Sequence, residues 1–149
     1  MPHRSDSGEQ RLAELELVHQ LSVDLGVPLE SAKGVALGNG IQIVPDGFNR
    51  DYRILCEAYA HIGFLKGGQL HKIARDILKM LAAEKRLRGK WRKILCFADE
   101  DAAQCVRCRS WLAAVCRDLG VEVKVFSLPV DLHTAVVVAQ QRQVMVNLL

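Results

Sequence analysis

The last third of the chain contains the pattern that most constrains its fold, two strand-like segments separated by one helix-like segment. Residues 94–98 (ILCFA) are nearly all apolar, and residues 121–126 (VEVKVF) alternate between apolar and polar. The intervening residues 100–119 are expected to form a helix that Gly120 ends. A strand, a helix and a second strand of these lengths predict a right-handed βαβ crossover with parallel strands. The chain is therefore expected to fold as an α/β domain.

The first two thirds of the chain supply a helix, three strands and another helix. Apolar residues recur at three- and four-residue steps over residues 9–25, which predicts an amphipathic helix. Short apolar segments separated by turn signals then predict a three-strand antiparallel meander. The predicted elements of this part are helix 9–25, strands 35–37, 41–44 and 53–60, and helix 69–87. A last helix is expected to begin at Asp131, a good N-cap residue.

Length and composition limit how the chain is organised. The 149 residues fit one domain, expected over residues 9–149, with residues 1–8 as a disordered N-terminus. The formal net charge of +3 permits a polyanionic partner without requiring one, because nucleic-acid binding depends on the clustering of basic residues. The chain shows no signal peptide, no apolar run long enough to span a bilayer and, among its five cysteines, no disulfide pattern. We therefore expect a cytoplasmic protein with free thiols and no membrane association.

Two acidic segments follow the order of a nuclease motif. Pro45-Asp46 comes first, and Glu57-Ala58-Tyr59 follows after ten intervening residues. With the predicted order of elements over roughly residues 9–127, these residues resemble the PD-(D/E)xK nuclease superfamily. The resemblance implies a restriction-endonuclease-like core, in which a three-strand antiparallel meander precedes a βαβ unit and helices cover both sides of one mixed sheet. Tyr59 stands where the motif has its lysine.

The pairing of the hairpin strands determines whether the two carboxylates meet. If the turn is centred on residues 50–52, residues whose numbers sum to about 103 face each other, and Asp46 and Glu57 lie roughly 5 Å apart at Cβ. Two carboxylates so close repel each other unless a cation or a proton lies between them. Mg²⁺ accepts a few carboxylate oxygens plus waters, and such an ion could polarise a phosphate and activate water. Alternatively, Asp46-Gly47 is itself the turn, and Glu57 is then only a solvent-facing strand residue.

The motif lysine has candidate replacements in the following helix and in the loop before it. Some members of the superfamily carry the lysine on a neighbouring element, and Lys72 and Lys66 both fit such a position. Four polar residues of the helix share one face because they recur at steps of three and four: Gln69, Lys72, Asp76 and Lys79. If that face looks toward the hairpin, Lys72 would steady the phosphate and Gln69 would orient water or backbone. Otherwise the face is solvated, which is the interpretation preferred for Lys79.

A basic segment is the second candidate for contact with a polyanion. Residues 84–93 (EKRLRGKWRK) hold six basic residues in ten, and such a cluster could contact nucleic-acid phosphates in a salt-dependent way. Basic residues are also favoured at a helix C-terminus with no ligand involved. The candidate nucleic-acid contacts are Lys66, Arg86, Arg88, Lys90 and Arg92.

Three further residue patterns have structural interpretations. Cys105-x-x-Cys108 is expected to pack in the core, because both cysteines continue an apolar helical stripe and no second ligand pair at zinc spacing is present. Asp99 follows strand 94–98, where open α/β sheets often bind ligands, but no glycine-rich phosphate loop is present. Asp99 is therefore expected to cap the next helix. His61 shares the strand face of Glu57 if alternation holds, which would place it at the rim of the site.

The resemblance implies a metal-dependent nuclease that hydrolyses phosphodiester bonds in DNA. Asp46 and Glu57 would bind Mg²⁺ or Mn²⁺, and Lys72 and Gln69 would complete the catalytic set. Two alternatives stay open: a catalytically inactive nucleic-acid-binding or assembly module with the same fold, and a nucleotide-binding α/β domain. A domain this small would be expected to act as a homodimer or with a partner protein, and the apolar residues 144–149 are a candidate contact surface.

Overall fold

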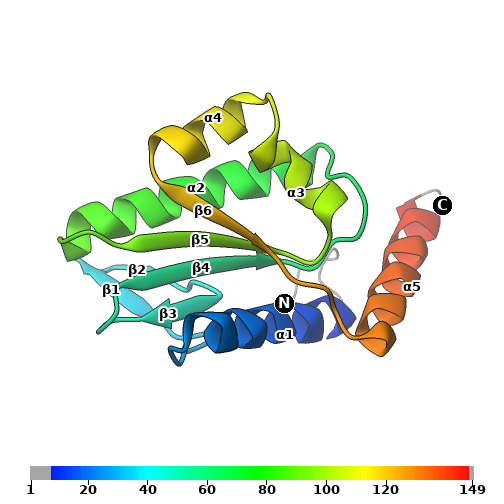
Figure 1. Cartoon of the computed structure of the whole chain (residues 1–149), viewed down its shortest axis with the longest axis horizontal. Coiled ribbons are helices and arrows are strands. Elements are labelled where there is room, and N and C mark those ends of the chain that lie inside the picture. The colour runs from blue at the N-terminus through cyan, green and yellow to red at the C-terminus, as the bar shows by residue number, and fades with distance from the viewer. Residues whose placement is uncertain (1–7, 148–149) are drawn as a thin grey trace.

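A computed structural model describes residues 8–147, which form a mixed four-stranded sheet with helices on both faces (Figure 1). The strands lie in the order β3 (Gly47–Asn49), β4 (Ile54–Tyr59), β5 (Arg92–Phe97) and β6 (Val121–Val125). β3 is antiparallel to β4, whereas β4, β5 and β6 are mutually parallel. The predicted α/β class and the parallel pairing of the strands in the last third are confirmed.

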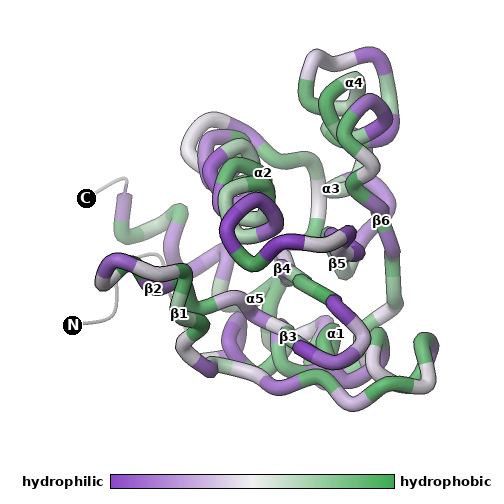
Figure 2. Tube along the Cα trace, turned by 90° about the vertical axis from the view of Figure 1, so that its left-hand side faces the viewer, coloured by the Kyte–Doolittle hydropathy of each residue, from purple (hydrophilic) through white to green (hydrophobic). Residues whose placement is uncertain are grey.

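The helices form two layers. On one face lie α1 (Gly8–Leu25) and, packed against it, α5 (Val130–Asn147). The other face is covered by α2 (Gly68–Leu87), α3 (Glu100–Arg107) and α4 (Trp111–Asp118). In the perpendicular view of Figure 2 the strands run between these layers. No helix within residues 8–147 is both long and apolar enough to cross a membrane.

Strand alternation divides β4 between the two layers. Leu55 and Tyr59 belong to the core under α2, whereas Cys56 and Ala58 belong to the core over α1. Every residue of β4 is buried, because the strand has a neighbour on each side and a helical layer on each face. Glu57 lies between Leu55 and Tyr59 in this alternation, so its side chain points into the α2 layer.

The predicted three-strand meander is wrong. β1 (Val35–Gly38) and β2 (Ile41–Ile43) form the predicted hairpin, but as a separate two-stranded antiparallel sheet. Pro45 has no N–H to donate to a strand ladder, and it interrupts the chain between β2 and β3. The outer edge of β3 pairs instead with Glu30, which exchanges two backbone hydrogen bonds with Phe48.

The predicted helix over residues 100–119 is divided in two. Ser110 caps α4 by accepting a hydrogen bond from the Ala113 N–H at 3.0 Å, which starts a new helix. The prediction that Cys105 and Cys108 lie on one apolar stripe of a single helix is therefore wrong. Cys105 packs partly buried against the core, whereas Cys108 follows α3 and is exposed.

The two ends of the chain bear on two further expectations. Of the segment predicted to be disordered, Gly8 begins α1 and residues 1–7 lie outside the described part. Of the proposed C-terminal contact surface, residues 148–149 also lie outside it. Val144, Met145 and Val146 belong to α5 and are exposed.

Candidate active site

The β3–β4 hairpin has the register predicted from its turn. Gly47 pairs with Cys56, and the pairing continues through Phe48 and Asn49 to a turn at residues 50–53. One step further along this register, Asp46 lies opposite Glu57. Because residues 50–53 form the turn, the alternative in which Asp46-Gly47 is the turn is wrong.

Asp46 extends the hairpin beyond its last backbone pair. Its Oδ2 accepts a hydrogen bond from the Ala58 N–H at 2.8 Å, so a side chain takes the place of a strand carbonyl. The residue is half-buried, in contrast to Glu57. This hydrogen bond holds the carboxylate against β4, beside the point where the Glu57 side chain leaves the strand.

Glu57 is a buried carboxyl group whose nearest charged partner comes from α2. The residue is 2% exposed, and Lys79 Nζ lies 2.6 Å from its Oε1. Among residues 8–147, this Oε1 is also a buried oxygen with no aligned hydrogen-bond donor, so its contact with Lys79 is an ion pair. A second cation could reach this oxygen only if the Lys79 ammonium moved away from it.

The solvated interpretation of Lys79 is wrong. Lys79 Nζ contacts Asp76 Oδ1 at 3.5 Å as well as Glu57, and its side chain is 27% exposed. Asp76 is buried at 4% exposure beside Ile77, whereas Leu78 is 66% exposed. Asp76 and Lys79 therefore lie on the side of α2 that faces β4, whereas Gln69 and Lys72 are exposed and Leu78 lies on the outside.

Side chains from α2 and β4 form a continuous polar seam. Its members are Glu57, Tyr59, His61, Gln69, Lys72, Asp76 and Lys79. Next to the Glu57–Lys79 pair, the Tyr59 O–H donates to Asp76 Oδ2 at 2.9 Å. Asp76 is a member of the site that was missed as a functional residue, although its spacing had placed it on the same helical face as Lys79.

The predicted catalytic residues Lys72 and Gln69 lie at the far end of the polar seam from Glu57. Lys72 Nζ lies 5.7 Å from the centroid of the Tyr59 ring, and Gln69 Nε2 lies 3.0 Å from His61 Nδ1. These residues line a pocket of about 130 Å³ at the end of β4. The structure thus brings Lys79, and not Lys72, to the two acids.

Burial and an excess of carboxylates control the ionisation of the site. Burial raises the pKa of Glu57 from 4.5 to about 9, the charges of Asp46 and Asp76 add to the rise, and Lys79 opposes it only in part. Burial alone would lower the pKa of Lys79, but the neighbouring Glu57 carboxylate outweighs this effect and the pKa is raised. Lys79 is therefore charged, and a cation bound beside Glu57 would favour its carboxylate form and oppose the rise in its pKa.

Asp46 and Glu57 are the two carboxylates of the site that could hold a divalent ion. No group of three His, Cys, Asp or Glu side chains within residues 8–147 could enclose a metal ion. Mg²⁺, however, is commonly bound through one or two carboxylates, with waters and substrate phosphates completing its coordination. Asp46 and Glu57 supply such oxygens, and the unsatisfied Glu57 Oε1 is consistent with that use.

Two of the remaining predicted contacts, Arg92 and Lys66, are set apart from the others. Arg92 makes two hydrogen bonds to the Glu122 carboxylate, at 2.9 and 2.7 Å. Lys66 lies in the loop before α2, at the end of the sheet opposite Arg86, Arg88 and Lys90.

Asp99 has a different role from the predicted helix cap. Its side chain makes no capping hydrogen bond in α3, and its Oδ2 accepts instead from the Gly63 N–H at 2.7 Å. Gln140 of α5 bonds both the N–H and the carbonyl of Ile62 in the same loop. Asp99 and Gln140 therefore hold the loop that joins β4 to α2.

The fold and the site define an α/β domain with an acid–lysine centre buried between β4 and α2. Comparison with protein-family models, with curated protein sequences and with solved structures finds no match to this chain.

Proposed function

We propose that this protein is a metal-dependent nuclease of the PD-(D/E)xK type that hydrolyses phosphodiester bonds in DNA. The observation that carries the proposal is the meeting of Asp46, Glu57 and Lys79. Asp46 lies opposite Glu57 in the hairpin register, and Lys79 Nζ lies 2.6 Å from Glu57 Oε1. This trio supplies the two acids and the lysine of the motif, with the lysine coming from α2 because Tyr59 occupies the usual place.

Each member of the trio has a distinct role in the proposed reaction. Asp46 and Glu57 would hold one Mg²⁺ or Mn²⁺, which would supply Lewis-acid polarisation of a phosphoryl oxygen and a lowered pKa of bound water. Lys79 turns its ammonium from Glu57 to a phosphate oxygen and stabilises the negative charge that develops there. Asp46 and Lys79 are the partly exposed members, so the substrate approaches from their side.

The residues at the far end of the polar seam are assigned to substrate binding. Lys72 and Gln69 lie beside Tyr59 and His61, away from the two acids. Lys72 is exposed and cationic, and it therefore suits a phosphate of the strand next to the scissile one. Gln69 positions the loop before α2 by accepting the Lys66 N–H at 3.0 Å.

Cleavage of duplex DNA in Mg²⁺ or Mn²⁺ tests the proposal. Replacements Asp46→Ala, Glu57→Gln and Lys79→Met are each expected to reduce the rate by roughly 100-fold or more, since each removes charge from the reacting centre. Lys33→Met is the matched control, because Lys33 is an exposed lysine paired with Glu30 on the surface. Equal activity in the wild type and in all four variants, or activity that survives chelation of the metal, would refute the proposal.

A catalytically inactive nucleic-acid-binding module with the same fold is the second candidate. It is favoured by Tyr59 at the motif position and by the ion pair that already occupies the Glu57 carboxyl group. Salt-dependent DNA binding that needs no metal, together with no cleavage in Mg²⁺ or Mn²⁺, would support this candidate over the nuclease.

A further inference from the structure

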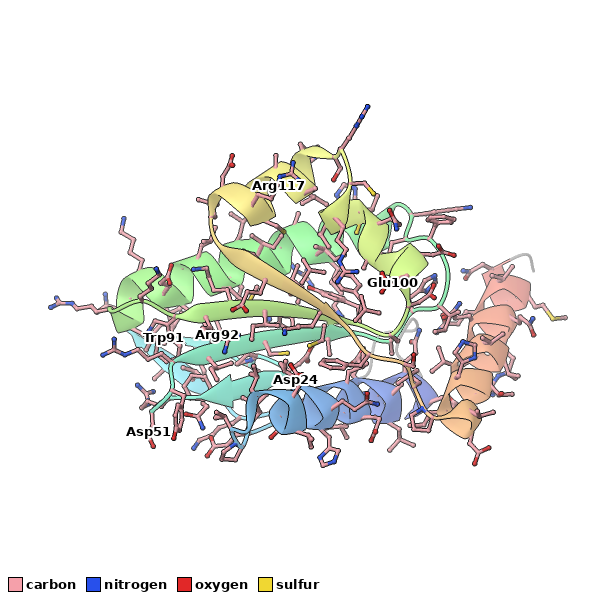
Figure 3. The ribbon with its side chains drawn as sticks, in the orientation of Figure 1. Asp24, Asp51, Trp91, Arg92, Glu100 and Arg117 are labelled. Atoms are coloured by element: carbon pink, nitrogen blue, oxygen red, sulfur yellow. The ribbon has the colours of Figure 1, made fainter. Side chains whose placement is uncertain are left out.

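Six basic side chains from three segments meet at the end of the sheet where β4 and β5 begin. The members of this basic tip are Arg50, Arg53, Lys85, Arg86, Arg88 and Lys90, and all six are exposed. They come from the β3–β4 turn, the last turn of α2 and the loop that follows it. Asp51 of that turn and Trp91, just before β5, mark this end of the molecule (Figure 3), and Figure 2 views it end-on with its mostly hydrophilic chain in front.

Tertiary contacts join the two loops of the basic tip. The Arg53 guanidinium lies so close to Gly89 that a Cβ there would be 2.6 Å from Nη1. The Arg53 carbonyl accepts the Arg92 N–H at 2.8 Å. Phe48 stacks on Trp91 with ring centroids 5.8 Å apart, and the Arg50 guanidinium lies 5.6 Å from the Phe48 centroid. These contacts hold the two loops together, so the cations lie on one fixed surface.

The cations of the basic tip are not neutralised by the chain. Within residues 8–147, none of the six makes an ion pair with a carboxylate. The charge of Lys90 acts on Glu84, but the Glu84 carboxylate is bound by Lys93 at 2.9 Å and by the Trp91 N–H. Unpaired cations on a fixed surface favour an anionic partner.

The charge of the molecule is concentrated at this tip. The tip carries six positive charges and one negative charge, that of Asp51, so its net charge is +5. The charges of Glu84 and Lys93 are left out because these two residues form an ion pair. The formal net charge of the whole chain is +3, so the rest of the molecule carries two negative charges in excess. Nucleic-acid binding depends on such clustering more than on the total charge.

We infer that the basic tip binds the phosphate backbone of double-stranded DNA as a contact separate from the acid–lysine site. A duplex presents a charge about every 1.7 Å along its axis, which suits several cations spread over one surface. Single-strand binders use exposed aromatic side chains as stacking platforms. At the tip, Phe48 and Trp91 are buried, so Tyr52 is the one exposed aromatic side chain of these three and the tip offers a single stacking platform and no row of them.

The tip would extend the contact of a duplex beyond the proposed nuclease site. Glu57 lies four positions after Arg53, the residue just before β4, a span of roughly 13 Å in an extended strand. The inference rests on the proposed function only for the identity of the substrate. Binding by the tip is expected whether or not the site cleaves DNA.

Fluorescence anisotropy with a labelled duplex, in a chelating buffer over about 50 to 200 mM salt, tests the inference. The variant Arg86→Ala/Lys90→Ala is expected to bind roughly tenfold or more weakly, and its salt dependence should fall by about two units of slope in log Kd against log salt. Arg86→Lys/Lys90→Arg retains the charges and is expected to bind as the wild type does.

The control variant is Arg75→Ala/Arg109→Ala, which removes two exposed cations outside the tip. It is expected to lose much less affinity and slope. Because the assay contains a chelator and measures binding alone, its outcome does not depend on whether the acid–lysine site cleaves DNA. Equal affinities and slopes for the tip and control variants would overturn the inference, as would binding to anionic lipid vesicles with no binding to duplex DNA.

Discussion

A single buried carboxyl group, Glu57, sets the electrostatics of the site. It lies in a strand buried on both faces, and Asp46 and Asp76 add negative charge around it, so its pKa rises to about 9. Lys79 compensates this only in part. The chain retains an ionisable group where an apolar or amide residue would be more stable, which is typical of a functional site.

Replacement Glu57→Gln is expected to stabilise the protein increasingly as pH rises. Because the folded-state pKa of about 9 lies above the ordinary 4.5, the folded state holds a proton that the unfolded state loses between these values. Glu57 therefore contributes stability below pH 4.5 that is lost as pH rises toward 9, whereas the amide of the Glu57→Gln variant does not titrate and has no such loss. Urea unfolding is expected to show a small difference near pH 5 and a gain near pH 8 of up to about 4 kcal/mol, because each pH unit between the two pKa values is worth about 1.4 kcal/mol.

The matched control for this prediction is Glu122, whose pKa is shifted in the opposite direction. The hydrogen bonds and charge of Arg92 lower the pKa of Glu122, so its carboxylate contributes stability above its ordinary pKa and loses it as pH falls. Glu122→Gln is therefore expected to weaken the fold near neutral pH and to have no effect in acid. A Glu57→Gln protein less stable than wild type at pH 8 would contradict the raised pKa of Glu57.

At the scale of elements, the β3–β4 hairpin and α2 build the site together. The hairpin register places Asp46 opposite Glu57, and the direction of α2 along β4 decides which helix residue reaches each strand residue. Lys79 meets Glu57, Asp76 meets Tyr59, and both contacts depend on how far α2 lies along the strand. A small displacement of β3 would disturb the site without touching either partner on α2.

Gly47→Ala is expected to produce that displacement. A Cβ at Gly47 would lie 3.2 Å from both Cys56 Cβ and Val18 Cγ1, so β3 or α1 has to shift. The expected cost in unfolding free energy is about 1–3 kcal/mol, with a reduced cleavage rate because the neighbouring Asp46 moves away from the Ala58 N–H.

Gly68→Ala is the control for this replacement. Nothing lies within 4 Å of a Cβ at Gly68, the first residue of α2, and alanine favours the helix. It is expected to leave stability unchanged or slightly raised. Equal unfolding free energies for the Gly47 and Gly68 variants would show that β3 accommodates a methyl group without moving.

At the scale of the whole molecule, order is greatest in the sheet and decreases along α5. β4 and β5 have a strand on each side and a helical layer on each face, and nearly all their residues are buried. In α5 only Val136 and Ala139 are buried among the described residues, and Gln140 is the last to anchor a loop. The helix beyond it makes few buried contacts.

Native-state hydrogen exchange is expected to follow this gradient. Amides of β4 and β5 should exchange only through global unfolding, whereas those of residues 143–147 should exchange through local fraying at far lower free energy. Mass spectrometry of peptides from these segments measures the difference. Comparable protection of residues 143–147 and β4 would indicate that a partner or a second copy covers the end of α5.

The sequence by itself determined the features that depend on neighbouring residues. The helices near residues 9–25 and 69–87, the parallel strands of the last third and the hairpin turn at residues 50–53 follow from periodicity and turn chemistry. The opposition of Asp46 and Glu57 belongs to this group, because the turn sets the register of its own two strands. The cap that divides α3 from α4 was also local, since Ser110 is a typical N-cap residue.

Only the tertiary structure decided which lysine meets the acids and which cations meet one another. Lys72 and Lys79 share one face of α2, so their spacing could not distinguish them; the position of the helix along β4 places Lys79 at Glu57. The basic tip likewise joins Arg53 to Gly89 across a gap of more than thirty residues. These contacts arise from packing between distant elements, whose offset is set by the shape of the whole core and leaves no periodic trace in the chain.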